Sequence, residues 1–167
     1  RGWAVPPWFC VTSEALQNFI DYHCLYGQLK CLEGRENLFE CVESLFLSKP
    51  LPEELQTILQ EAMGAMDLTG KVVTVRSSAF VGDDLEKRLS SFCCLQSFAE
   101  VSEALRRCWA ALFCWYRQRR LQSFIPQEEG VIIQKMVQAD SSGVAFSRSP
   151  ANFLRGDKAA VDAVRGG

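Results

Sequence analysis

The order of its patterned segments constrains the fold of this chain more than any other feature. Segments with the apolar spacing of helices come first, and the two strongest strand patterns, residues 71–76 and 131–137, come later. One more helical segment and polar connections separate these two strands. Strands that do not alternate regularly with helices favour an α+β fold over a doubly wound parallel sheet. The sequence therefore predicts helices packed on a small, mostly antiparallel sheet.

The individual elements follow from local patterns. A β-branched and aromatic stretch at 8–12 predicts a short first strand, and Gly143 to Ser147 should return as an antiparallel partner of 131–137. Apolar residues at helical spacing predict four helices. The first follows a cap at Ser13 and is marked by Leu16, Phe19 and Ile20, and the second is marked by Leu38, Cys41, Val42 and Leu45. The third is marked by Leu55, Ile58, Leu59, Ala62, Met63 and Met66, and the fourth by Val101, Leu105, Cys108, Leu112 and Trp115.

Composition excludes several classes of protein. The 167 residues carry 20 acidic and 18 basic side chains, so binding of nucleic acid through bulk charge is not expected. No apolar run approaches the ~20 residues of a membrane-spanning helix, so no membrane partner is expected either. The eight cysteines lack zinc-ligand spacing, and most fall on apolar stripes. We interpret six of them as core thiols of a cytoplasmic protein.

The junction of strand and loop at Val75-Arg76-Ser77-Ser78-Ala79 is the most suggestive local feature. An arginine and two hydroxyls delivered by a strand can bind phosphate, because guanidinium pairs with phosphate oxygens in a bidentate way. An ordinary polar strand end is the alternative reading of the same residues, and the composition alone leaves both open.

Three other candidates have simpler readings. His23, the only histidine, is expected at a helix boundary rather than in a catalytic group. Asp83 and Asp84 could hold a divalent cation, but adjacent loop acids are mostly solvated. Five arginines interleaved with aromatic residues could form a nucleic-acid patch, but we expect them on the solvated face of the last helix, at Arg106, Arg107, Arg117, Arg119 and Arg120.

Several separated motifs resemble one family in the correct order. They are 5–12 (VPPWFCVT, compared with VPPGFVVT), 75–79 (VRSSA), 82–84 (GDD, compared with GED), 104–113 (ALRRCWAALF, compared with AVRRCWASLF), 131–137 (VIIQKMV, compared with VVVQKMV) and 143–150 (GVAFSRSP, compared with GVLFTRDP). The family is the ATP-binding domain shared by phosphoenolpyruvate synthase, pyruvate phosphate dikinase and rifampin phosphotransferase.

The resemblance implies the first subdomain of an ATP-grasp type nucleotide site, with ATP and Mg²⁺ as cofactors. By that resemblance Arg76 and Ser77 would contact the phosphates. Gln134 and the backbone of Lys135, Met136 and Val137 would hold the adenine edge. The family is a kinase-type transferase that passes phosphate through a histidine on another domain. The partners implied are therefore ATP and the remaining domains of a parent enzyme or a partner chain.

The chain also departs from the family pattern. Trp8 stands where the family has glycine in VPPGF, and residues 91–97 lack the glycine of the SFAGQ loop, with Cys93 and Cys94 in its place. We expect residues 1–167 to form a partial nucleotide-binding domain, with 151–167 starting the link to a second subdomain. Because of the two cysteines, a second hypothesis stays open: a degenerate, non-catalytic remnant that serves as an interaction or regulatory module.

Overall fold

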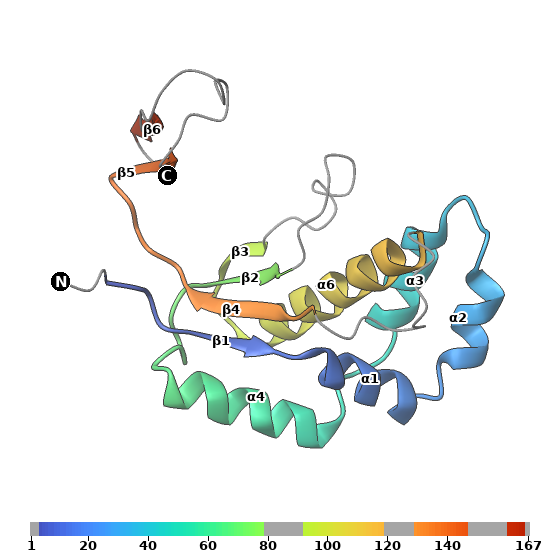
Figure 1. Cartoon of the computed structure of the whole chain (residues 1–167). Helices are drawn as coiled ribbons and strands as arrows, with labels where there is room; N and C mark the ends of the chain where they lie inside the picture. Colours follow the sequence, from blue (N-terminus) through green and yellow to red (C-terminus); the bar gives the residue numbers. More distant parts are fainter. Residues whose placement is uncertain (1–3, 79–91, 119–128, 147–159, 166–167) are drawn as a thin grey trace. The chain divides into compact units, whose positions relative to one another are not determined.

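A computed structural model describes residues 4–78, 92–118, 129–146 and 160–165 (Figure 1). The chain divides into two compact units, Arg1–Met136 and Val137–Gly167. The first unit contains β1 (Trp8–Val11), α1 (Ser13–Tyr22), α2 (Tyr26–Leu32), α3 (Leu38–Leu47), α4 (Glu53–Ala65), β2 (Val73–Ser77), β3 (Phe92–Leu95), α6 (Phe98–Gln118) and β4 (Val131–Lys135). The second contains β5 (Ser141–Phe146) and β6 (Ala160–Arg165).

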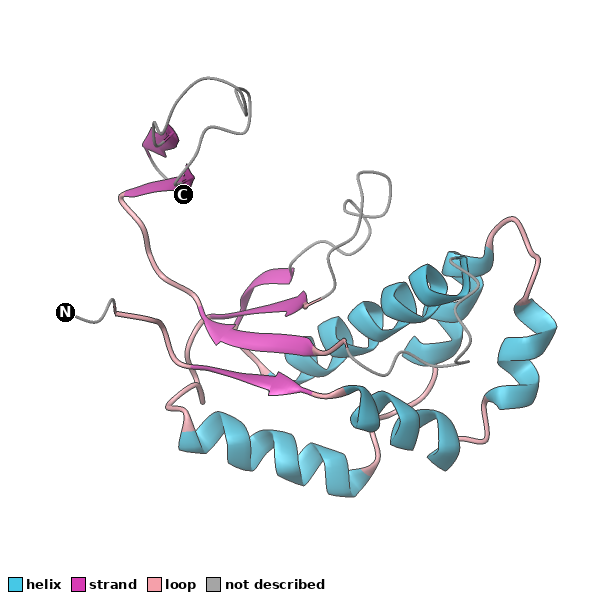
Figure 2. Cartoon of the chain, in the orientation of Figure 1, coloured by secondary structure: helices cyan, strands magenta, loops and turns pink. Residues whose placement is uncertain are grey.

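The first unit is a four-stranded sheet with helices packed against it (Figure 2). The strand order is β1-β4-β2-β3, and every neighbouring pair is antiparallel. Helix α6 packs against β2, β3 and β4, and α3 packs against α6. The predicted α+β class is confirmed.

The predicted helices are present, and the described residues contain one further helix. Leu16, Phe19 and Ile20 are buried on α1 as the spacing predicts. On α4 only Leu59 and Met63 are buried, whereas Ile58 is 53% exposed. Helix α2 was not predicted, because it has seven residues around Gly27 and buries only Leu29.

Helix α6 crosses the core, and its arginines are not simply solvated. Trp109 and Phe113 are among its largest buried side chains. Arg106 is half-buried and donates hydrogen bonds to the carbonyls of Leu47 and Lys49, at 2.9 and 2.7 Å, where α3 ends. The prediction of a solvated arginine face is therefore wrong for Arg106, because the end of α3 needs donors for its carbonyls.

The other described arginines of α6 form ion pairs. Arg107 bridges Glu43 on α3 and Glu103 on its own helix, and Arg117 pairs with Glu33. These contacts join α6 to neighbouring helical segments. Residues 119 and 120 lie outside the described residues.

The second unit corrects one predicted strand pairing. Strand β5 pairs with β6 in an antiparallel two-stranded sheet, whereas the sequence predicted pairing with β4. The physical reason is that β1 and β2 occupy both sides of β4, so β4 has no free edge. The segment 151–167, expected to begin a link, contains β6.

The cysteines also differ from expectation. All eight lie among the described residues and none is in a disulfide, but only Cys108 and Cys114 are buried and Cys41 is half-buried. The other five are exposed, so the prediction of six core thiols is wrong.

Candidate functional site

The four-stranded sheet has two different faces. Side chains alternate along each strand, so Val73, Val75, Val131 and Ile133 point to the side covered by helices and are fully buried. The intervening residues form the opposite side, which we call the open face, and all of them are exposed or half-buried: Trp8, Cys10, Thr74, Arg76, Ile132 and Gln134. Polar and aromatic groups therefore collect on one side of the sheet.

Arg76 lies on the open face near the end of β2, opposite Ile132. Its side chain is exposed, and within the described part of the chain it makes no ion pair. The strand leads directly into residues 79–91, which include Gly82, Asp83 and Asp84 and lie outside the described residues. An exposed guanidinium at a strand end is available to an anionic ligand.

The two serines after Arg76 have different positions. Ser77 pairs with Val131, so alternation places it on the helix-covered side. The N–H of Ser78 donates to the Gly130 carbonyl at 2.8 Å, and the Ser78 Oγ accepts from the Gly130 N–H at 2.7 Å. Ser78 thus fastens β2 to the start of β4. The role of Ser77 at a phosphate stays a prediction.

Gly130 is required at this junction by the close approach of β1. A Cβ atom there would lie 2.5 Å from the Cys10 Sγ and 2.9 Å from the Val11 carbonyl oxygen. The backbone atom is a fixed obstacle, so any other residue would push the two strands apart. The glycine therefore permits the close approach of β1 to the start of β4.

The residues predicted at the adenine edge occupy the end of β4. Gln134 is half-buried on the open face, opposite both Trp8 on β1 and Thr74 on β2. The N–H of Lys135 donates to the Pro7 carbonyl and that of Met136 to the Val72 carbonyl, both at 2.9 Å. Both N–H groups therefore have partners within the sheet, because β4 lies between β1 and β2. Val137 begins the second unit.

Trp8 and Thr74 are open-face residues that sequence reasoning did not select. Trp8 is 47% exposed. Because Lys135 bonds to Pro7, the neighbouring Trp8–Gln134 pair falls between hydrogen-bonded pairs, where opposed side chains are closest. Sequence reasoning could have indicated Trp8 only once the pairing of β1 with β4 was known, because Trp8 lies directly opposite Gln134.

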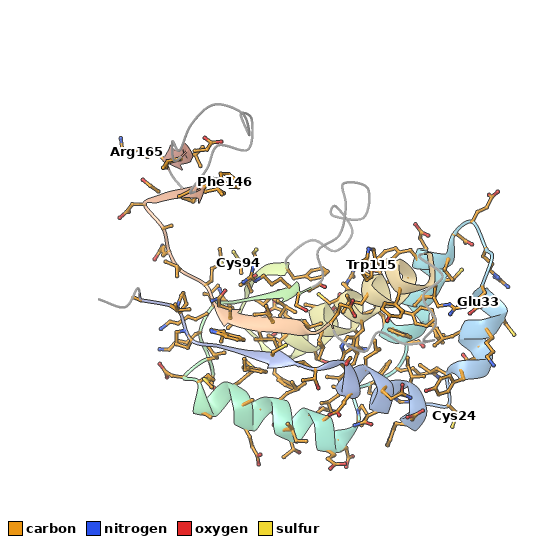
Figure 3. The ribbon with its side chains drawn as sticks, viewed as in Figure 1. Cys24, Glu33, Cys94, Trp115, Phe146 and Arg165 are labelled. Carbon is orange, nitrogen blue, oxygen red and sulfur yellow. The ribbon has the colours of Figure 1, made fainter. Side chains whose placement is uncertain are left out.

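A β-bulge brings Cys93 and Cys94 to the same region. The partners of β3 on β2 are Leu95 for Val73 and Phe92 for Val75, so two cysteines oppose the single residue Thr74. Cys94 has a φ of 62°, in the left-handed region that favours glycine. Figure 3 labels Cys94 on β3, at the end of the sheet order opposite β1. This left-handed backbone coincides with the position where the family motif has glycine.

The remaining candidates lie away from the open face. The His23 Nε2 is 2.8 Å from the Pro50 carbonyl oxygen, and its ring contacts Phe19 edge-on, so His23 has a structural environment. A groove of about 750 Å³ between α2 and α3 is lined by residues including Cys31, Glu40 and Cys41. Among the described residues, no three His, Cys, Asp or Glu side chains are grouped to hold a metal ion.

Comparison with known proteins identifies the family of this chain. The model of the pyruvate phosphate dikinase AMP/ATP-binding domain family matches residues 1–166. The chain belongs to this family. No described helix is both long and apolar enough to cross a membrane.

Individual relatives agree with that assignment. Phosphoenolpyruvate synthase of Synechocystis sp. is 32% identical over 88% of this chain and 21% of its own length. Rifampicin phosphotransferase of Streptomyces sp. is 29% identical over 97% of this chain and 20% of its own length. The prodigiosin synthesizing transferase PigC of Serratia marcescens is 29% identical over 93% of this chain. The chain spans about a fifth of the length of these relatives, 17% in the case of PigC.

Proposed function

We propose that the open face is the first half of an ATP-grasp type nucleotide site. The site would serve a phosphotransferase whose other domains lie on a longer chain or a partner. A histidine on one of those domains would carry the phosphate to the acceptor. Residues 1–167 would be the first subdomain, with 151–167 leading toward the second. Membership in the family of AMP/ATP-binding domains supports the nucleotide, and the much greater length of the relatives supports further domains.

The observation that carries the proposal is the shared face of Arg76, Gln134 and Trp8. Trp8 and Gln134 are direct partners across β1 and β4, and Arg76 lies one strand further and two residues along. With strands ~4.8 Å apart and a rise of ~3.4 Å per residue, Trp8 and Arg76 are separated by about 12 Å. This separation suits a nucleoside triphosphate that extends from its base to its terminal phosphates.

Each of these residues has a chemical role in the proposal. The exposed indole of Trp8 offers a flat apolar surface on which a planar base can stack. The Gln134 amide can both donate and accept at the edge of adenine. Arg76 would neutralise the phosphates. Ser77 and the backbone of Lys135, Met136 and Val137 remain in the proposed set, although the two N–H groups of Lys135 and Met136 already have partners within the sheet.

ATP would bring Mg²⁺ to this site. When bound, the cation would balance charge on the phosphates. We assign it no protein ligand, because the described residues offer no cluster of carboxylates beside Arg76. Asp83 and Asp84 are close to Arg76 in the sequence but lie outside the described residues.

Calorimetric titration of the full chain with Mg-ATP tests the proposal. Arg76→Ala should weaken binding about tenfold or more, since hydrogen bonds to charged groups are worth roughly 1.5–3 kcal/mol. The matched control is Arg117→Ala, which removes an arginine paired with Glu33 on the helical side and should leave the affinity unchanged.

Two results would overturn the proposal. One is the absence of any heat with the wild-type chain at millimolar Mg-ATP. The other is equal affinity of the Arg76→Ala and wild-type chains. The hypothesis of a non-catalytic remnant is not favoured by the comparisons, because the relatives are a synthase and two transferases.

A further inference from the structure

The bulge in β3 places two adjacent thiols on the same side of the sheet. In a regular strand, neighbouring side chains point to opposite faces. Here Cys93 and Cys94 together oppose Thr74, and both reach residues of the open-face side. The Cys93 Sγ is 3.7 Å from the Thr74 Oγ1, and the Cys94 Sγ is 3.7 Å from the Met136 Sδ. Met136 follows Gln134 by two residues and so shares its face.

The three sulfur atoms are accessible. Cys93 and Cys94 are exposed, and Met136 is 37% exposed. The edge position of β3 leaves this end of the sheet without a further strand among the described residues. An exposed thioether held against a thiol is an unusual use of methionine, whose apolar side chain normally fills gaps in a core.

We propose that Cys93, Cys94 and Met136 form a binding site for a soft monovalent cation of the copper(I) class. Thiolate and thioether sulfur atoms select such ions. Two sulfur atoms bonded to one three-coordinate metal at ~2.3 Å are separated by about 4.0 Å, which is close to the 3.7 Å between the Cys94 Sγ and the Met136 Sδ. Binding releases the two thiol protons to solvent, and neither sulfur nor metal changes oxidation state.

The backbone supports this assignment. Cys94 keeps a left-handed φ of 62°, which disfavours any side chain, and such strained residues often cluster at ligand sites. A glycine would relieve the strain but would remove the sulfur that contacts Met136. The presence of cysteine at this position is thus explained by a role for its sulfur.

The ligand set also distinguishes between metals. Zinc in structural sites takes four Cys or His ligands, and no described group of three His, Cys, Asp or Glu side chains provides them. Two thiols and a thioether suit a three-coordinate soft ion. The site does not depend on the proposed nucleotide function, because its ligands bind the metal without ATP.

Anaerobic titration of the reduced full chain with copper(I), against a chromophoric copper(I) chelator, tests the proposal. We expect one ion per chain to resist the chelator. Cys93→Ser, Cys94→Gly and Met136→Leu should each lower the affinity at least tenfold. The Cys94→Gly variant also suits the backbone, so its loss of binding cannot be ascribed to misfolding.

Exposed thiols elsewhere provide matched controls. Cys24→Ser and Cys31→Ser change exposed cysteines on the helical side of the same unit and should leave copper(I) binding unchanged. X-ray absorption of the copper(I) complex should show three sulfur neighbours. The proposal would be overturned if the Cys94→Gly chain retained copper(I), or if Cys31→Ser lost as much copper(I) affinity as Cys94→Gly. Tighter binding of zinc(II) than of copper(I) by the wild-type chain would overturn it as well.

Discussion

The two faces of the four-stranded sheet use the same strands for different purposes. Val75 and Ile133 on the covered face are fully buried, while their immediate neighbours Arg76 and Gln134 are exposed or half-buried on the open face. Because a strand alternates with a period of two, each strand supplies the core with every second residue. Stability and the proposed ligand binding would therefore be separated residue by residue, and substitutions one position apart should have different consequences.

The largest contrast is expected in thiol reactivity. Burial of Cys108 on α6 raises its pKa to about 12 from an ordinary 9.0. Below pH 9 its thiolate fraction is therefore about a thousandfold lower than that of an unburied cysteine. Cys93 is exposed beside the open face. Alkylation followed by mass spectrometry at pH 8 should label Cys93 within minutes and leave Cys108 unlabelled.

The same thiol gives a pH dependence of stability. The unfolded chain loses the Cys108 proton near pH 9, whereas the folded chain keeps it to about pH 12, so this group destabilises the fold as the pH rises above 9. Denaturation in urea should make Cys108 as reactive as Cys93. Comparable labelling of both thiols in the folded chain would contradict the separation of the two faces.

A pair of neighbouring isoleucines tests the contrast in packing. Ile133→Ala removes a fully buried side chain and should lower the free energy of unfolding by roughly 3 kcal/mol, within the range of core truncations. Ile132→Ala, on the half-buried open face, should cost about 1 kcal/mol or less. Urea denaturation followed by circular dichroism measures both, and equal losses would show that the open face is packed as tightly as the core.

The smallest effect is expected at the bulge. Cys94→Gly should stabilise the chain by about 1 kcal/mol, because a left-handed residue with a side chain costs roughly 1–2 kcal/mol and glycine itself loses some entropy on folding. Cys93→Gly is the matched control and should not stabilise, since Cys93 is not among the residues with positive φ. The melting temperatures of the two variants decide the comparison, and a lower value for Cys94→Gly would refute it.

Long segments with strong periodicity were predicted well. The strands 71–76 and 131–137 and the helices after Ser13 and around Leu105 are all present, with shifts of a few residues at their ends. Their apolar spacing reflects a single dominant contact, either one sheet face or one helix stripe. Arg76 and Gln134 could likewise be selected from motifs, and the structure places both on the open face, while their role in a shared site stays a prediction.

The missed features depend on contacts between distant segments. Strand β3 escaped prediction because Phe92 and Leu95 are both half-buried at a spacing of three residues, which is a helical spacing. Only the bulge allows a strand to bury both, and the bulge is defined by its pairing with β2. The pairing of β5 was mispredicted because no local pattern shows that β1, over a hundred residues earlier, occupies the far side of β4.

The same bulge has a consequence for how the protein behaves at high concentration. Strand edges with regular unpaired N–H and C=O groups act as templates for pairing with other chains. Of the described strands in the sheet, β1 and β3 are the outer ones. Pro6 and Pro7, which precede β1, have no N–H to offer, and the bulge at Cys93 and Cys94 interrupts the regular spacing of β3. The bulged border of β3 is thus a poor template, and the two prolines prevent the row of donors on β1 from continuing toward the N-terminus, which limits edge-to-edge aggregation.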